Sequence, residues 1–174
     1  MTDRIRFISY TAVGIALFTA VSLCLQVPFF ENYYFCLGYI VLAVYSDRFG
    51  PLSAAAVGGL GTVVYCILTN GLRGMPGWAL GNVLIAVCLS YVFQASRKIP
   101  KPVIRIGFEL AMIVIITAAG ILGVKSLTEH ILYAQPFLLR AAKNSYAFVA
   151  DTIMLGAALP VCRLLPKQNH PAEQ

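Results

Sequence analysis

The charged residues of this chain are widely spaced, and this spacing constrains the fold more than any other feature. A helix needs about 20 mostly apolar residues to cross about 30 Å of hydrocarbon. Six uncharged or nearly uncharged intervals stand out: one between Arg6 and Glu31, and others at residues 32–46, 49–72, 74–96, 106–124 and 136–165. The second interval is the shortest. We therefore predict an all-α integral membrane protein, a six-transmembrane-helix bundle.

Composition and length agree with a membrane protein. Of the 174 residues, 59% are apolar and 11% are charged, whereas about a quarter of a soluble domain is charged. A chain of this length has no room for both a membrane bundle and a catalytic domain of about 100 residues. We expect one membrane domain over residues 1–166 and a polar cytoplasmic tail over residues 167–174.

Turn-forming residues lie between the uncharged intervals, where a chain of six separate helices needs loops. Gly and Pro at residues 47–51 and 97–102 predict breaks between the second and third helices and between the fourth and fifth. Ser126-Leu127-Thr128-Glu129 matches a capping box. It predicts a separate short helix at the surface, ending before Pro136.

The distribution of the 13 Lys and Arg residues predicts the orientation. With a cytoplasmic N-terminus, nine cations fall on the inner side: Arg4, Arg6, Arg48, Arg97, Lys98, Lys101, Arg105, Arg163 and Lys167. The outer side then has four: Arg73, Lys125, Arg140 and Lys143. The positive-inside rule favours this arrangement, with both termini cytoplasmic, in a multi-pass protein of a bacterial-type plasma membrane. The net charge of +6 is then explained by topology and contact with membrane lipid, and no nucleic-acid partner is expected.

Small residues indicate where helices touch protein, because they let backbones approach closely. Ala12, Ala16 and Ala20 repeat at four-residue spacing in the first helix. This stripe either packs inside the bundle or forms an outward face that docks a partner protein. Glycines at residues 58–61, and the pair Gly77 and Gly81, predict internal helix packing.

Polar residues inside a membrane are costly and are functional candidates by default. In the last helix, Arg140, Asn144 and Asp151 follow a helical rhythm and share one face, with Lys143 beside it. The two cations have an alternative explanation, because long basic side chains also reach toward outer headgroups. Asn144 and Asp151 are too deep in the helix for that explanation.

Further polar and aromatic residues fall near the same outer side: Tyr65, Asn70, Arg73, Trp78 and Asn82. Together with the last helix they predict an outward-facing small-molecule site. Three ligand chemistries stay open. The cations suit a carboxylate or phosphate, the aromatic side chains suit a flat heterocycle, and Asp151 suits a cationic or amino-bearing ring.

Other chemistries find no support in the sequence. The five cysteines lie singly in apolar segments, without CxxC or a nearby His, so neither a metal site nor a disulfide framework is expected. The segment at residues 120–126 lacks the residue order of a phosphate-binding loop. We expect no enzyme activity and no cofactor. Glu109 is predicted to pair with Arg105 at i,i+4 spacing.

Several segments resemble the substrate-binding S component of energy-coupling factor (ECF) vitamin transporters, particularly the riboflavin-transporter-like branch. They are Arg4-Ile5-Arg6 with the alanine stripe, Cys36-Leu37-Gly38-Tyr39-Ile40, and residues 49–55 followed by Gly58-Gly59-Leu60-Gly61. The resemblance covers nearly the whole chain. It implies a subunit of an ABC importer that captures a vitamin or precursor at the outer face. It also implies docking of Ala12, Ala16 and Ala20 on a transmembrane coupling protein, which works with two cytoplasmic ATPases.

Two other functions remain as alternatives. An autonomous secondary transporter would need internal repeats or broken helices around a midplane ion site, and residues 1–95 and 96–174 show no mutual repeat. A non-transporting membrane assembly protein would have no use for a polar outer pocket.

Overall fold

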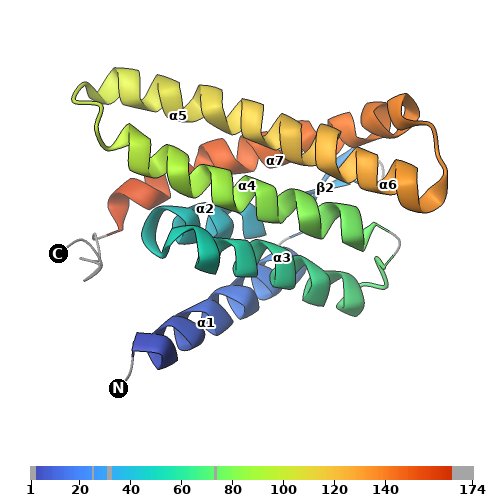
Figure 1. Cartoon of the computed structure of the whole chain (residues 1–174), viewed down its shortest axis with the longest axis horizontal. Coiled ribbons are helices and arrows are strands. Elements are labelled where there is room, and N and C mark those ends of the chain that lie inside the picture. Colours follow the sequence, from blue (N-terminus) through green and yellow to red (C-terminus); the bar gives the residue numbers. More distant parts are fainter. Residues whose placement is uncertain (1–2, 25, 31–32, 73, 166–174) are drawn as a thin grey trace.

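The computed structural model describes residues 3–24, 26–30, 33–72 and 74–165, and it is a helical bundle with one small hairpin (Figure 1). The predicted tail at 167–174 lies outside these residues. The elements are α1 Asp3–Cys24, β1 Gln26–Phe30, β2 Tyr33–Cys36, α2 Gly38–Arg48, α3 Gly50–Leu68, α4 Met75–Ser96, α5 Pro102–Thr117, the π-helix η1 Ala118–Lys125, α6 Ser126–Tyr133 and α7 Phe137–Leu164.

Within the described residues, five helices are long and apolar enough to cross a membrane. They are Arg4–Cys24, Gly50–Leu68, Met75–Ser96, Pro102–Tyr133 and Phe137–Leu164. The expected second span, at residues 32–46, instead consists of β2 and the 11-residue α2. An 11-residue helix is too short to cross alone, so the count of six spans stays a prediction.

The hairpin was not predicted from the sequence, because it straddles the first two uncharged intervals on either side of Glu31. Strands β1 and β2 pair antiparallel, with Gln26 opposite Cys36. The segment is rich in aromatic residues, which favour strands, and Pro28 has no N–H for a helical hydrogen bond. The first helix therefore ends at Cys24 rather than continuing toward Glu31.

The predicted breaks are confirmed. Helix α2 ends at Arg48 and α3 begins at Gly50, whose φ of 81° is readily adopted by glycine. Helix α4 ends at Ser96 and α5 begins at Pro102.

The segment after α5 differs from the sequence prediction. The chain continues without a break through η1 into α6, so no capping box starts a new helix. The Ser126 hydroxyl donates to the Ile121 carbonyl oxygen at 3.3 Å, and the side chains of Ser126 and Glu129 are buried. The predicted separate start is therefore wrong, but the segment does lie at the surface, because Leu127, Ile131 and Leu132 are exposed. The predicted end is confirmed, because α6 stops at Tyr133 and Ala134 turns the chain with a φ of 51°.

The glycines of α3 and α4 lie where helix backbones approach each other closely, as predicted. A Cβ on Gly81 would lie 2.7 Å from the Gly120 carbonyl oxygen, and one on Gly77 would lie 2.9 Å from that of Lys125. A Cβ on Gly58 would approach the Asn82 carbonyl oxygen at 3.0 Å. These glycines hold α4 against η1 and against α3, which confirms the prediction of internal packing.

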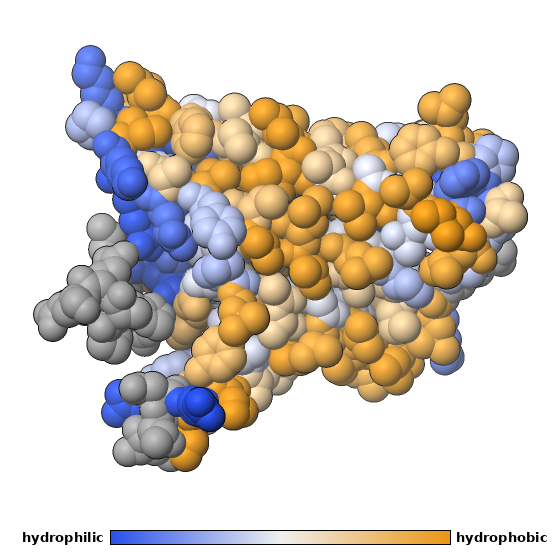
Figure 2. All heavy atoms as spheres, viewed as in Figure 1, coloured by the Kyte–Doolittle hydropathy of each residue, from blue (hydrophilic) through white to orange (hydrophobic). Residues whose placement is uncertain are grey.

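The two ends of the bundle differ in character. Helix α1 begins and α7 ends at the same end (Figure 1), and Figure 2 shows hydrophilic atoms gathered there beside an apolar belt. We call this end, where Arg48, Arg97, Arg105 and Arg163 lie around one cavity, the arginine end. By the positive-inside rule it is the expected cytoplasmic end.

Candidate functional site

Buried polar side chains gather between the helices toward α6 and the start of α7, which lie away from the arginine end (Figure 1). In lipid such groups must satisfy one another or bind something. We call the following residues the polar cluster: Tyr39, Thr62, Trp78, Asn82, Lys125, Ser126, Glu129, Arg140, Asn144 and Asp151.

A chain of hydrogen bonds links three helices in the cluster. The Trp78 Nε1 donates to the Tyr39 hydroxyl at 3.0 Å, and this hydroxyl donates to Asn82 Oδ1 at 2.7 Å. The Asn82 amide then donates to Thr62 Oγ1 at 2.7 Å. The Tyr65 ring meets Trp78 edge-on, with 5.5 Å between ring centroids. The aromatic pair thus adjoins a fixed row of donors and acceptors.

Helix α7 contributes the polar face expected from its sequence. Asn144 Nδ2 donates to Ser126 Oγ at 3.0 Å and to Glu129 Oε2 at 3.2 Å. The Arg140 Nε lies 3.7 Å from the same Glu129 oxygen, too far for a hydrogen bond. This Nε is buried and has no hydrogen-bond partner among the described residues. It can therefore donate to a ligand.

Asp151 and Lys125 carry the remaining opposite charges of the cluster. The Asp151 side chain is buried, lies beside the Tyr39 hydroxyl and interacts electrostatically with the Lys125 ammonium. Lys125 also interacts with Glu129. Two cations thus face two carboxylates, and the cluster carries no net formal charge. This balance weakens the anionic-ligand interpretation and favours an uncharged ligand.

The structure brings together most, but not all, of the expected site residues. Six of the nine gather in the cluster or against it: Tyr65, Trp78, Asn82, Arg140, Asn144 and Asp151. Asn70 is exposed at the end of α3, with a φ of 55°, and Lys143 is exposed on α7. Arg73 lies outside the described residues.

Sequence reasoning missed five members of the cluster: Tyr39, Thr62, Lys125, Ser126 and Glu129. Lys125 served only to predict orientation, and Ser126 with Glu129 fitted a capping box. The π-helical turns of η1 take up extra residues, so they rotate everything that follows relative to an α-helical pattern. The mostly polar segment at residues 125–130, which directly follows an apolar helix, was the signal available.

The alanine stripe faces outward. Ala12, Ala16 and Ala20 are all exposed, whereas Phe18 and Ser22 on the opposite face of α1 are buried. The alternative in which the stripe packs inside the bundle is therefore wrong. Its docking role stays a prediction.

The part of the chain that the structure describes contains no cluster of metal-binding side chains. No group of three or more His, Cys, Asp or Glu side chains there could hold a metal ion. The five cysteines are free thiols.

Comparison with known proteins decides the family. The family model described as "ECF-type riboflavin transporter, S component" matches residues 3–161. This chain belongs to that family. The chain is also similar to the UPF0397 protein YdcD of Lactococcus lactis subsp. lactis (strain IL1403), 31% identical over 92 residues. The match covers 51% of this chain and 49% of YdcD, so it spans about half the length of that relative.

Family membership agrees with the five apolar helices. The chain is a multi-pass cell-membrane protein of a transporter family, and that family implies a vitamin-transporter subunit rather than an enzyme. Membrane-embedded partners are implied in the same way.

Proposed function

We propose that this chain is the substrate-capture subunit of an ECF-type ABC importer and that the polar cluster binds the substrate. The observation that carries the proposal is the hydrogen-bonded row from Trp78 through Tyr39 to Asn82, beside a charge-balanced set of acidic and basic side chains. Buried polar groups in a membrane bundle are expensive. A binding role explains why so many are gathered at one place.

The substrate class that fits best is an uncharged flat heterocycle, and riboflavin is our first candidate. Its ring edge presents an N–H between two carbonyl oxygens, and amides such as Asn82 and Asn144 both donate and accept. The Tyr65–Trp78 pair provides an aromatic wall for the ring. The buried Arg140 Nε has no hydrogen-bond partner among the described residues, so it can donate to a carbonyl or hydroxyl oxygen.

Charge balance argues against a phosphorylated substrate at this site. A phosphate would add negative charge beside Glu129 and Asp151, whose countercharges are already engaged. We therefore expect flavin mononucleotide to bind more weakly than riboflavin.

Transport requires partners that recognise the outside of the bundle. We propose that the exposed stripe of Ala12, Ala16 and Ala20 packs against the transmembrane coupling protein. Two cytoplasmic ATPases then power release inward.

A titration of the purified protein tests the proposal. Riboflavin fluorescence should be quenched saturably, at one site per chain and without ATP, with flavin mononucleotide as the charged comparison. A panel containing thiamine, pyridoxine and biotin should bind more weakly. If no vitamin binds, the proposal fails and an assembly role gains support. Uptake into liposomes by this chain alone would instead indicate an autonomous secondary transporter.

A further inference from the structure

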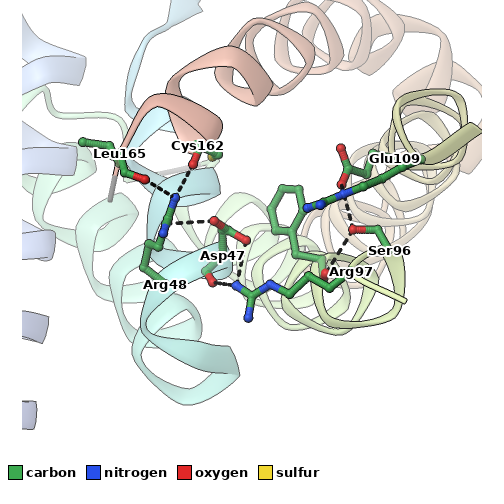
Figure 3. A network of polar contacts seen from close by, with 9 residues as sticks. Asp47, Arg48, Ser96, Arg97, Glu109, Cys162 and Leu165 are labelled. Carbon is green, nitrogen blue, oxygen red and sulfur yellow. Dashed lines mark hydrogen bonds and ion pairs between the residues drawn. The ribbon is translucent and has the colours of Figure 1, made fainter. Parts of the chain in front are cut away.

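The arginine end contains a cavity of about 190 Å³ between α2, α4, α5 and α7. Figure 3 shows the polar contacts among several of the residues that line it. Small-molecule sites usually measure about 300 Å³ or more. The cavity is therefore too small for a vitamin, but it can accommodate a single functional group. It is lined by residues far apart in the chain, such as Asp47 and Arg163.

The lining is strongly basic. Four guanidinium groups, those of Arg48, Arg97, Arg105 and Arg163, face two carboxylates, those of Asp47 and Glu109, which leaves a formal charge of +2. A cavity of this kind attracts anions. It differs in this respect from the polar cluster, whose formal charges cancel.

Each carboxylate already holds two arginines in place. Asp47 Oδ1 lies 3.0 Å from Arg97 Nη2, and Asp47 Oδ2 lies 2.9 Å from Arg48 Nε. Glu109 accepts from Arg105 Nε at 2.9 Å and from Arg163 Nη2 at 2.7 Å, which also confirms the predicted Arg105–Glu109 pair. The carboxylates thus hold the guanidinium groups in place before any anion binds. Each guanidinium has five N–H donors, and most of these donors are not used in the pairs with Asp47 and Glu109.

Arg48 provides an independent sign that an anion is expected here. Its side chain is only 8% exposed, and its Nη2 is fixed by the carbonyl oxygens of Cys162 and Leu165 at the end of α7 (Figure 3). Its Nη1 is buried and has no hydrogen-bond partner among the described residues. A buried cationic donor without an acceptor is costly. A bound anion in the adjoining cavity would supply that acceptor.

We propose that this cavity binds one phosphate group, either the phosphodiester of an anionic lipid headgroup or a free phosphate. Arginine forks match phosphate oxygens in pairs, and basic pockets between membrane helices on the cytoplasmic side suit lipid headgroups. The bound phosphate would join α2, α4, α5 and α7 at the end where α7 finishes. The site is separate from the polar cluster.

Native mass spectrometry and thermal unfolding of the whole chain test this site. The protein is reconstituted in nanodiscs of phosphatidylcholine alone or with phosphatidylglycerol, and in parallel is titrated with inorganic phosphate in a non-ionic detergent. We expect Arg105→Gln to weaken the bound phosphate about tenfold or more. Lys98→Gln is the matched control, because Lys98 is an exposed cation at the same end and does not line the cavity.

Arg48→Lys is the second variant, in case removal of charge prevents folding. It keeps the positive charge but removes the buried Nη1, so it should also weaken binding. Retention of phosphatidylglycerol without any effect of inorganic phosphate identifies a lipid site, and stabilisation by inorganic phosphate identifies a free anion. If neither probe binds, or if Lys98→Gln weakens binding as much as Arg105→Gln, the proposal is overturned. Neither measurement uses a vitamin, so the result is independent of the proposed function.

Discussion

The Tyr39 hydroxyl donates a 2.7 Å hydrogen bond to the Asn82 amide oxygen, across 43 positions of sequence. Both side chains are fully buried. The bond joins α2, which is too short to cross a membrane alone, to α4, which can cross. Trp78 donates to the same hydroxyl from about one turn earlier on α4. The short helix is therefore part of the candidate site and not merely a connection.

Removing the amide at the centre of this row should weaken vitamin binding. Asn82→Ala deletes the acceptor for Tyr39 and the donor to Thr62. Because this disrupts the row that we propose forms the binding surface, we expect a loss of about 1–3 kcal/mol in binding free energy, roughly 5- to 150-fold in Kd. Riboflavin fluorescence titration measures this loss.

Ser90→Ala is the matched control for Asn82→Ala. Ser90 is also a buried polar residue of α4, but its hydroxyl donates only to the Ala86 carbonyl oxygen within the same helix. Its replacement should leave Kd unchanged. Equal losses in both variants would mean that α4 packing, and not the Asn82 amide, supports binding.

The effects of substituting Lys125 and Asp151 on the stability of the protein should depend on each other. Lys125→Met removes a cation that attracts the buried Asp151 carboxylate, so this variant should be less stable than the unchanged protein. Asp151→Asn in the same chain removes that carboxylate, so the double variant should be more stable than Lys125→Met alone. Thermal unfolding of the four proteins in one detergent gives the coupling free energy. Additive effects would argue against the pair.

A bulky residue on the alanine stripe should prevent docking on the coupling protein without preventing riboflavin binding. Ala16→Trp adds a large side chain to an exposed position of α1. We expect loss of uptake and of complex formation with the coupling protein, while riboflavin binding persists. Leu17→Trp is the control, because Leu17 is 46% exposed beside the stripe and already large. Loss of riboflavin binding in Ala16→Trp would indicate a collapsed bundle instead.

The contact between α4 and η1 should not tolerate a side chain at Gly81. A Cβ there would lie 2.7 Å from the Gly120 carbonyl oxygen, so Gly81→Val must separate the two backbones at a cost of about 1–3 kcal/mol. Gly107→Ala in α5 meets nothing within 4 Å, and it should be neutral or slightly stabilising. Melting temperatures compare the two. A tolerated Gly81→Val would show that this close approach is dispensable.

The candidate site was only partly readable from the sequence. Asn82, Asn144 and Asp151 were identifiable because a polar residue deep in an apolar helix has few structural explanations. Tyr39 was not, because a tyrosine in a short helix is ordinary. Lys125 and Glu129 were not, because their inward direction depends on the π-helical segment between residues 118 and 125.

The sequence by itself determined that the chain lies in a lipid bilayer, that its fold is helical, where most helices begin and end, and which family it belongs to. Long uncharged runs and Gly/Pro breaks act locally along the chain, so they can be recognised without a structure. The tertiary structure decided which polar groups meet, that the alanine stripe faces outward, and that Arg140 is opposed by Glu129. It also revealed the basic cavity around Arg48. These properties arise from contacts between residues as much as 117 positions apart, such as Arg48 with Leu165, and no local pattern records the register in which distant helices pack.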